Sequence, residues 1–487
     1  MSVKNLRALI SSNKFFYITL GVMVFSCLLF VFSIAYRIPP DEYYHFRFIE
    51  YYATQPVTNG PFISNQGVEH FDLRDITRIP NYLYHYGMSF PLRGLFLVTD
   101  SLLLQVMVLR LITLSIGVAS LFVIRRILRQ IKASPFAQNS VLLLISLTGM
   151  MVWMFSSINY DVPATLLYLA CVSLALSILQ GKGITTKRLA LFSLFAMLCV
   201  LTKVTFIPFL ALLGIITVFL KRKDLHFTQN LQLKNFQHVL LIIAVVVVGF
   251  LFMERIGGNV IKYRQIEVTC DKIHAYSDCM QDDVFNRNET QLKAYAQQKA
   301  RGDGVTYQPY QFTQMWTTFM YERSHFYYGH EQMRANYGAK VLAVATAAGF
   351  IVMAAVFRKK IVVTKGEKLL FWVTLSYATT MYLFNLQTWL KFGQPYAFQG
   401  RYLFPVAPFL YYFCIKLLIL TYKSLKASWR KAFLVVVASL LILSIYTHLP
   451  LLVFYRGTEA KWYTDSTRNF HLRIQSELRK LNIKPII

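Results

Sequence analysis

The sequence lacks the signatures of a protein that uses a soluble nucleotide. In its 487 residues no glycine-rich phosphate loop follows a predicted strand, and no dinucleotide-binding fingerprint, internal repeat or low-complexity tract is visible. Acidic residues are scarce, with 23 Asp and Glu against 51 Lys and Arg. Nothing therefore indicates a nucleotide cofactor, and the net charge of +28 raises the question of which anionic partner the chain meets.

Apolar residues are in excess, at 55% hydrophobic and 15% aromatic, which lies outside the usual range for a soluble globular chain. Many runs are long enough to cross a bilayer, and a shorter run at 189–202, ending in Thr202 and Lys203, adds a half-buried span. The pattern predicts an all-α polytopic membrane protein with about eleven spans. The long runs are 15–36, 104–124, 138–158, 162–180, 204–220, 237–253, 338–357, 369–386, 403–420 and 432–448.

Basic residues cluster in the short loops at every second gap between the apolar runs, which is the positive-inside pattern. This pattern places the N-terminus in the cytoplasm and argues against nucleic acid as the partner. The first run is too long for a signal peptide and lacks a small-residue cleavage site, so we expect a retained span. The clusters are Lys4, Arg7 and Lys14; Arg125, Arg126, Arg129 and Lys132; Lys182, Lys187 and Arg188; Lys221, Arg222 and Lys223; Arg358, Lys359 and Lys360; and Lys423, Lys426, Arg430 and Lys431.

The polar segments divide the chain. We expect an N-terminal transmembrane module at 1–253 with a long first external loop at 37–92, an external cap at 254–337, a C-terminal transmembrane module at 338–448, and a tail at 449–487 that an odd number of spans leaves outside. The cap holds Cys270 and Cys279, whose spacing allows a disulfide in an oxidising compartment such as a bacterial periplasm. Two unpaired thiols are the alternative.

The first external loop opens with two successive prolines, which we expect to end the first membrane helix and let a new helix start. Asp41 then falls in the first turn, beside Glu42 and one turn before His45, with Arg37 close by. The alternative is purely structural: Asp41 caps a helix lying on the membrane and Glu42 is solvated.

The rest of this loop divides into two parts. Four aromatic residues at helical spacing predict a helix lying in the membrane interface, with its rings at headgroup level. The part that follows is charged enough to face water. The aromatic residues are Tyr44, Phe48, Tyr51 and Tyr52, and the charged part includes His70, Asp72, Arg74, Asp75, Arg78, His85 and Tyr86.

Three further polar residues are predicted at the outer face. Asp161 lies in a tight turn before a proline, where plain turn chemistry is the alternative. Lys203 interrupts apolar segments, where an ionisable residue indicates a functional site unless it snorkels to the surface. Arg401 precedes a late span on the outer side and calls for an anionic partner, either a lipid phosphate or a substrate phosphate.

Acidic and basic residues are predicted together at the outer face, and no nucleotide-binding motif is predicted on the cytoplasmic side. This combination favours a reaction on a membrane lipid that carries a phosphate. A carboxylate can act as general base toward an acceptor hydroxyl, and Lys203 and Arg401 can stabilise the charge that grows on a phosphate leaving group. This combination describes glycosyl transfer from a polyprenyl-phosphate sugar.

The same residues resemble the GT-C superfamily of integral membrane glycosyltransferases, in particular bacterial members with Pro-Pro-Asp-Glu-x-x-His after the first span and Gln-Gly-Arg-Tyr before a late one. Both motifs are intact, at Pro39–His45 and Gln399–Tyr402, and the Asn159–Asp161 turn agrees with the group. The external segment 254–337 and the tail match nothing in it. A member that adds one sugar to O-antigen or another surface polysaccharide fits the length.

The resemblance implies a GT-C-like bundle and inverting transfer at the outer face of the bacterial inner membrane, from undecaprenyl-phosphate sugar to a glycan acceptor. Asp41 would be the base, with Glu42 as second choice and His45 beside them. Arg37, Lys203 and Arg401 would bind the donor phosphate, and Asp161, Gln399 and Tyr402 would contact substrate. No cofactor is expected; a divalent metal on Asp41 and Asp161 is the alternative.

Two other functions remain open from the sequence. A transporter or flippase of lipid-linked saccharides would carry charges near mid-bilayer and a repeated half. A polysaccharide polymerase or ligase would use similar external residues but consume a diphosphate-linked oligosaccharide.

Overall fold

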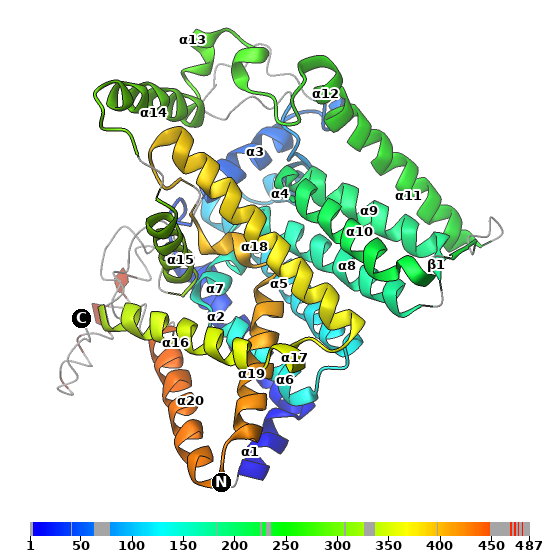
Figure 1. Ribbon diagram of the computed structural model, residues 1–487. Helices are drawn as coiled ribbons and strands as arrows, with labels where there is room; N and C mark the ends of the chain where they lie inside the picture. Colours follow the sequence, from blue (N-terminus) through cyan, green and yellow to red (C-terminus); the bar gives the residue numbers. More distant parts are fainter. Residues whose placement is uncertain are drawn as a thin grey trace.

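The structure is a computed structural model of the chain, and it confirms the predicted all-α membrane class (Figure 1). It describes residues 3–39, 41–62, 78–181, 183–224, 226–229, 235–305, 308–325, 337–396 and 398–448, together with residues 468–469, 472–473, 476 and 480 of the tail. The first half consists of α1 (Val3–Ile10), α2 (Asn13–Ser33), α3 (Glu42–Thr54), η1 (Val57–Asn59), α4 (Leu83–Phe96), α5 (Leu102–Gln130), α6 (Pro135–Ser146), α7 (Gly149–Phe155), α8 (Asp161–Gln180), α9 (Thr186–Thr202), η3 (Val204–Phe206), α10 (Ile207–Lys221), η4 (Arg222–Asp224) and α11 (Phe236–Phe252).

A short parallel pair of strands, β1 (Ile184–Thr185) and β2 (Phe227–Thr228), ties the α8–α9 connection to the segment before α11. The second half consists of the π-helical turn η5 (Met253–Gly257), α12 (Gly258–Tyr263), η6 (Cys270–Lys272), α13 (Tyr276–Cys279), α14 (Asp283–Ala300), α15 (Pro309–His325), α16 (Tyr337–Val356), α17 (Arg358–Ile361), α18 (Lys365–Phe392), η7 (Gly400–Leu403), α19 (Ala407–Ser424) and α20 (Ala427–His448).

The expected count of eleven spans is not confirmed. In the described residues six helices are long and apolar enough to cross a membrane, or seven if the α6–α7 pair, bent by 74°, is one span. The runs predicted at 189–202, 338–357, 403–420 and 432–448 also form helices, α9, α16, α19 and α20, but these are not among the six. The structure therefore supports a polytopic membrane protein without fixing the number of crossings.

The end of the first membrane helix was predicted wrongly. α2 ends at Ser33, well before the two prolines, and Ile34 is already extended. The cause is Arg110 of α5, which donates hydrogen bonds to the carbonyl oxygens of Val31 (3.1 Å) and Ile34 (2.7 Å). Because the last carbonyls of a helix have no partner within it, a buried arginine that binds them stabilises the end at that point.

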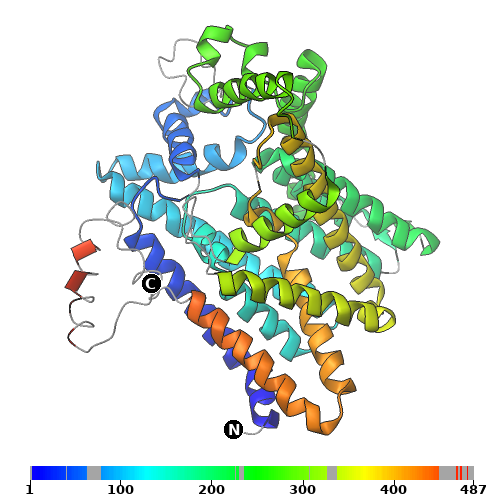
Figure 2. The same ribbon diagram turned by 60° about the vertical axis from the view of Figure 1, so that its left-hand side comes forward.

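The helices form a bundle with a helical cap at one end. Figures 1 and 2 agree in placing α13 and α14 at this end and α1 at the other, with α3 and α4 beneath the cap. One large apolar core runs through the bundle and includes Trp153, Tyr168 and Phe209, with the ring of Phe209 stacked on that of Tyr377 at 3.8 Å. This core fixes the ends of α8, α9 and α10 relative to one another.

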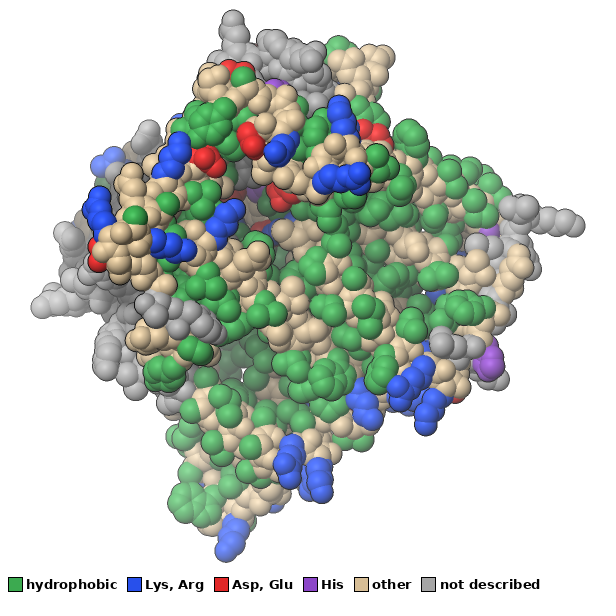
Figure 3. Space-filling model, turned by 45° about the horizontal axis from the view of Figure 1, so that its top comes forward, with side chains coloured by type: hydrophobic (Ala, Val, Ile, Leu, Met, Phe, Trp, Pro, Cys, Tyr) green, Lys and Arg blue, Asp and Glu red, His purple; other side chains and the backbone are tan. Residues whose placement is uncertain are grey.

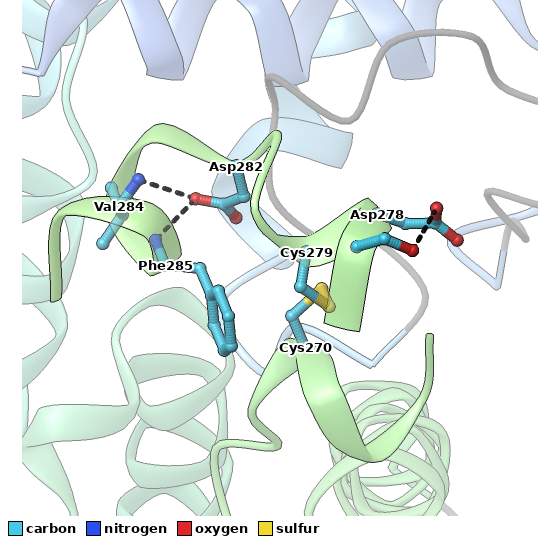
Figure 4. Close-up of a disulfide and its surroundings, with 7 residues drawn as sticks. Cys270, Asp278, Cys279, Asp282, Val284 and Phe285 are labelled. Atoms are coloured by element: carbon cyan, nitrogen blue, oxygen red, sulfur yellow. Dashed lines mark hydrogen bonds between the residues drawn. A yellow bond between two sulfur atoms is a disulfide. The ribbon is translucent and has the colours of Figure 1, made fainter. Parts of the chain in front are cut away.

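The cap is stabilised by a disulfide and by docking on α18. Cys270 and Cys279 are joined, and Asp282 accepts the backbone N–H groups of Val284 and Phe285 at the start of α14 (Figure 4). Gly393, which ends α18 with a φ of +68°, packs against a ring of α14, that of Tyr295. The four-part division of the chain remains a prediction, and most of the tail at 449–487 lies outside the described residues.

The first external loop forms the predicted helix as α3, but part of its aromatic face packs inside the protein. Phe48 and Tyr52 are buried against Tyr82 and Leu201, whereas Tyr44 and Tyr51 are half-buried. The expectation that His85 faces water is also wrong, because it is buried on α4. Apolar burial against α4 and α9 outweighs interfacial placement here. His70, Asp72, Arg74 and Asp75 lie outside the described residues.

Candidate active site

Asp41 precedes α3 and does not cap it. Its backbone is left-handed, with φ at 61°, and its side chain makes no hydrogen bond to the first turn. Arg401 Nη2 instead donates to Asp41 Oδ2 at 2.5 Å. The capping alternative is therefore excluded by the geometry, and the backbone conformation is one that Asp adopts more readily than most residues. The Asp41 side chain remains 42% exposed, so a substrate can reach it.

Arg401 lies in η7 and has only 5% of its side chain exposed. Besides Asp41, it approaches a second carboxylate, with its Nε 3.6 Å from Asp161 Oδ2. Burial lowers the pKa of Arg401, but Tyr402 and the two carboxylates outweigh it, so the pKa lies well above its ordinary value. Gly400 allows this placement, because a side chain there would collide with Ser324 on α15.

Asp161 and Lys203 meet where two membrane helices end. Asp161 is the first residue of α8, and its backbone N–H is accepted by Asn159 Oδ1 at 2.9 Å. Lys203 separates α9 from η3 and forms a buried ion pair with Asp161. The Lys203 ammonium also lies over the rings of Tyr160, at 5.0 Å, and Tyr402, at 4.6 Å. Burial lowers the pKa of Lys203, but Asp161 and the two tyrosines raise it above its ordinary value.

The structure thus brings four of the predicted residues into one acid–cation cluster: Asp41, Asp161, Lys203 and Arg401. They come from four segments separated by long stretches of chain, and their formal charges sum to zero. Lys203 and Arg401 are buried, so their charges are screened by water less than exposed ones. An arrangement of this kind can hold an anionic group and present a carboxylate beside it.

Glu42 faces away from this cluster into a separate buried ion pair. Its side chain is fully buried, and Arg110 donates Nε to Oε1 at 2.8 Å and Nη2 to Oε2 at 2.6 Å. The backbone N–H of Ile158 donates to Glu42 Oε1 at 3.0 Å. Arg110 also binds carbonyls at the end of α2, as described above. Glu42 therefore joins α2, α3, α5 and the turn before α8.

Arg110 was missed in the sequence, although a signal was present. It lies inside the apolar run 104–124, and a charged residue within a membrane helix is expected to have a buried partner. The partner itself is not apparent from the sequence, because Glu42 is 68 residues away.

His45 is buried and paired with a second histidine that the sequence reading placed in water. His45 Nδ1 lies 2.9 Å from His85 Nε2, and His85 Nδ1 lies 3.0 Å from the Asn81 carbonyl oxygen. Because a carbonyl only accepts, His85 donates through Nδ1, and its Nε2 in the neutral ring accepts from His45. Asn81 Oδ1 accepts the N–H of Val204, so this chain of contacts reaches the residue after Lys203.

The remaining predicted residues divide between the cluster and its surroundings. The Tyr402 ring lies over the Lys203 ammonium, as described above. Gln399 precedes η7, and its backbone carbonyl oxygen accepts the Tyr402 backbone N–H at 3.1 Å. Arg37 is exposed, and its guanidinium lies 4.6 Å from the centre of the Tyr43 ring. Arg37 is therefore not part of the acid–cation cluster.

The carboxylates that could hold a metal are engaged by cations. Asp41 and Asp161 both approach Arg401, and Asp161 also pairs with Lys203. Within the described ranges no group of three or more His, Cys, Asp or Glu side chains is arranged to bind a metal ion. The residues present thus fit the neutralisation of an anion by side-chain cations better than a carboxylate cage.

Fold and cluster together define a polytopic membrane protein with a buried acid–cation site where several of its helices end. The chain belongs to the family described as "Predicted membrane protein (DUF2142)", whose model matches residues 71–410. A comparison with curated proteins finds no match.

Solved structures supply the fold comparison. An oligosaccharyltransferase from Archaeoglobus fulgidus in its apo form matches with a TM-score of 0.50 and 12% identity, over 98% of this chain and 60% of that one. The oligosaccharyltransferase AglB from the same archaeon, with an inhibitory peptide and a dolichol-phosphate, matches with a TM-score of 0.48 and 12% identity, over 97% of this chain and 60% of that one. ArnT from Cupriavidus metallidurans matches with a TM-score of 0.34 and 11% identity, over 83% and 75%. The first likeness shows the fold alone, and this chain spans 60% of that enzyme's length.

Proposed function

We propose that the protein is an inverting glycosyltransferase, which moves one sugar from a polyprenyl-phosphate donor to a glycan acceptor at the outer face of the membrane. The observation that carries the proposal is the convergence of Asp41, Asp161, Lys203 and Arg401 into one cluster beneath a helical cap. The GT-C-like fold supports it, since the archaeal structure with that fold is an oligosaccharyltransferase.

In this proposal Asp41 is the general base. The acceptor hydroxyl oxygen attacks the anomeric carbon while the bond from that carbon to the phosphate oxygen breaks. The hydroxyl proton passes to Asp41, and the phosphate leaves on its lipid carrier. Asp41 suits the role better than Glu42, because Asp41 is partly exposed whereas Glu42 is buried and bound on both oxygens.

Arg401 and Lys203 would stabilise the charge on the leaving phosphate. Arg401 already binds Asp41, so a donor phosphate competes with that carboxylate for the same guanidinium. Binding of the donor therefore frees Asp41 for the acceptor hydroxyl. Asp161 keeps Lys203 in place through their ion pair, while Tyr402 lies over the same ammonium.

The proposal extends to compartment and substrate. The basic short loops orient the N-terminus to the cytoplasm, and a disulfide in the cap suits an oxidising space such as the periplasm outside a bacterial inner membrane. An undecaprenyl-phosphate monosaccharide as donor and O-antigen or another surface polysaccharide as acceptor fit this setting. Transfer without a metal agrees with cations already bound to both carboxylates.

The test is a donor assay with the full-length protein in nanodiscs. Undecaprenyl-phosphate monosaccharides and undecaprenyl-diphosphate oligosaccharides are supplied separately, and glycans from cells with and without the gene are compared by mass spectrometry. We expect release of undecaprenyl phosphate with the first donor class and one added hexose mass on a surface glycan.

Two aspartate variants make the test specific. Asp41→Asn should lower turnover about 1,000-fold, within the loss expected of a general base, while the protein still inserts and folds. Asp271→Asn changes an exposed aspartate in the cap and serves as the matched control. Full activity in Asp41→Asn removes Asp41 as base, and turnover of the diphosphate donor alone would instead indicate a polymerase or ligase.

A further inference from the structure

A second polar site lies at the opposite end of the helices that carry the acid–cation cluster. A cavity of about 310 Å³ is lined by the last turns of α5 and α8 and by the start of α9. Asp161 and Lys203 lie at the other ends of α8 and α9. Ser177, in the cavity wall, is 16 residues after Asp161 on α8, so the two sites are about 24 Å apart along the helix, which is most of the ~30 Å thickness of the hydrocarbon core.

The cavity has the composition of an anion site at a membrane boundary. Arg126, Lys187 and Arg188 line it together with the hydroxyls of Ser177 and Thr185, while its apolar wall is formed by Leu174 and Leu191. None of its lining residues is acidic, and no described carboxylate forms an ion pair with Arg126 or Arg188.

Neighbouring contacts hold the cavity in shape. Thr185 accepts the backbone N–H of Arg188 and so caps α9, whose positive dipole end adds to the side-chain charges. The β1–β2 pair fixes the loop that precedes α9. Lys221 donates to the Gly181 carbonyl oxygen at 2.6 Å, which satisfies the end of α8 with a cation other than those lining the cavity. Arg126 and Arg188 therefore remain available to a ligand.

The surroundings identify the class of ligand. In Figure 3 most acidic side chains lie in the upper part of the face shown, intermixed with Lys and Arg, whereas the lower edge carries Lys and Arg groups with few acidic ones. A basic pocket between membrane helices on the side of the positive loops is the usual setting for an anionic lipid headgroup. Leu174 and Leu191 give the first carbons of acyl chains an apolar wall, which a soluble anion does not need.

We propose that this cavity binds the phosphate headgroup of an anionic phospholipid in the cytoplasmic leaflet, with Arg126 and Arg188 as its principal contacts. The site is separate from the proposed active site and does not depend on the proposed reaction. A bound lipid there would fix α5, α8 and α9 at the cytoplasmic surface.

The experiment is native mass spectrometry of the delipidated full-length protein in detergent, titrated with short-chain phosphatidylglycerol. The test variant is Arg126→Gln/Arg188→Gln. The matched control is Lys359→Gln/Lys360→Gln, which removes two exposed cations of α17 away from the cavity. Phosphatidylcholine of equal chain length and inorganic phosphate are run as competitors, and thermal unfolding checks that each variant is folded.

We expect a one-to-one phosphatidylglycerol adduct in the wild type and in the control. Binding should weaken about fivefold for each arginine removed, and so about 25-fold in the double variant. Phosphatidylcholine and millimolar phosphate should not compete. Equal binding by the double variant and the control overturns the site, as does equal binding of phosphatidylcholine. Displacement of the lipid by inorganic phosphate overturns the assignment to a lipid.

Discussion

Glu42→Gln should destabilise the protein by about 3 kcal/mol, because it leaves the buried Arg110 guanidinium without its counter-charge. Breaking a buried ion pair on one side costs about 3–5 kcal/mol. Glutamine keeps a carbonyl oxygen that can accept from Arg110 or from the N–H of Ile158, so the lower end of the range applies. The loss concerns folding, since Glu42 does not touch the acid–cation cluster.

A matched control lies on the same helix. Glu50 pairs with Arg47 at 3.1 Å, but both side chains are about one-third exposed, at 34% and 31%. An exposed pair of this kind contributes less than about 1 kcal/mol. Glu50→Gln should therefore leave the unfolding midpoint almost unchanged, although the substitution is chemically identical.

The assay is unfolding of the purified protein in detergent, followed by the fraction that remains monodisperse after heating, with donor turnover measured on the folded fraction. Glu42→Gln should lose stability and keep turnover per folded molecule. Adding Arg110→Gln should cost less than the sum of the two single changes, because the variants share one interaction. A Glu42→Gln protein that melts like the wild type and is inactive would refute the reasoning and make Glu42 the base.

Two further predictions concern pH and the cap. The pKa of Lys203 is raised above its ordinary value, so the stability from its pair with Asp161 is complete below about pH 10.4 and is lost only as pH rises through the folded pKa. Burial also raises the pKa of Tyr160, whose ring lies against the Lys203 ammonium, to about 12. Neither group should therefore lose its proton below about pH 10, and kcat/KM should not fall with rising pH in that range; a fall near pH 8 would contradict this. Cys270→Ser/Cys279→Ser should destabilise the cap by up to about 3 kcal/mol from loop-closure entropy, seen as faster proteolysis between α12 and α14, and an unchanged cleavage pattern would refute it.

The sequence predicts the parts of the molecule that depend on local composition. Apolar runs give the membrane helices, and the side of the basic loops places Asp161, Lys203 and Arg401 at one face, where the structure brings them together. The disulfide spacing and the helix after residue 41 follow from similarly short patterns. These features need no knowledge of which helices are neighbours.

The sequence-based predictions fail where tertiary contacts determine which side chains are buried. Phe48 and Tyr52 have the spacing of an interfacial helix, but a face of the same period can equally bury against α4, and periodicity does not distinguish the two. His85 lies in a charged stretch, yet its ring is buried because His45 and the Asn81 carbonyl provide its hydrogen bonds. In each case the deciding partner belongs to another element.

The choice between Asp41 and Glu42 shows how far sequence reasoning can reach. Arg110 lies within an apolar run, and a buried guanidinium requires a carboxylate close to its own depth in the membrane. Among neighbouring acids, Glu42 is the first residue of α3 and turns toward α5, whereas Asp41 in its left-handed conformation turns toward Arg401. The arginine that each carboxylate binds thus distinguishes the structural role of Glu42 from the proposed catalytic role of Asp41. The two arginines separate the roles of the two acids, because Glu42 is fully buried and accepts three hydrogen bonds, whereas Asp41 is exposed enough for a substrate to reach it.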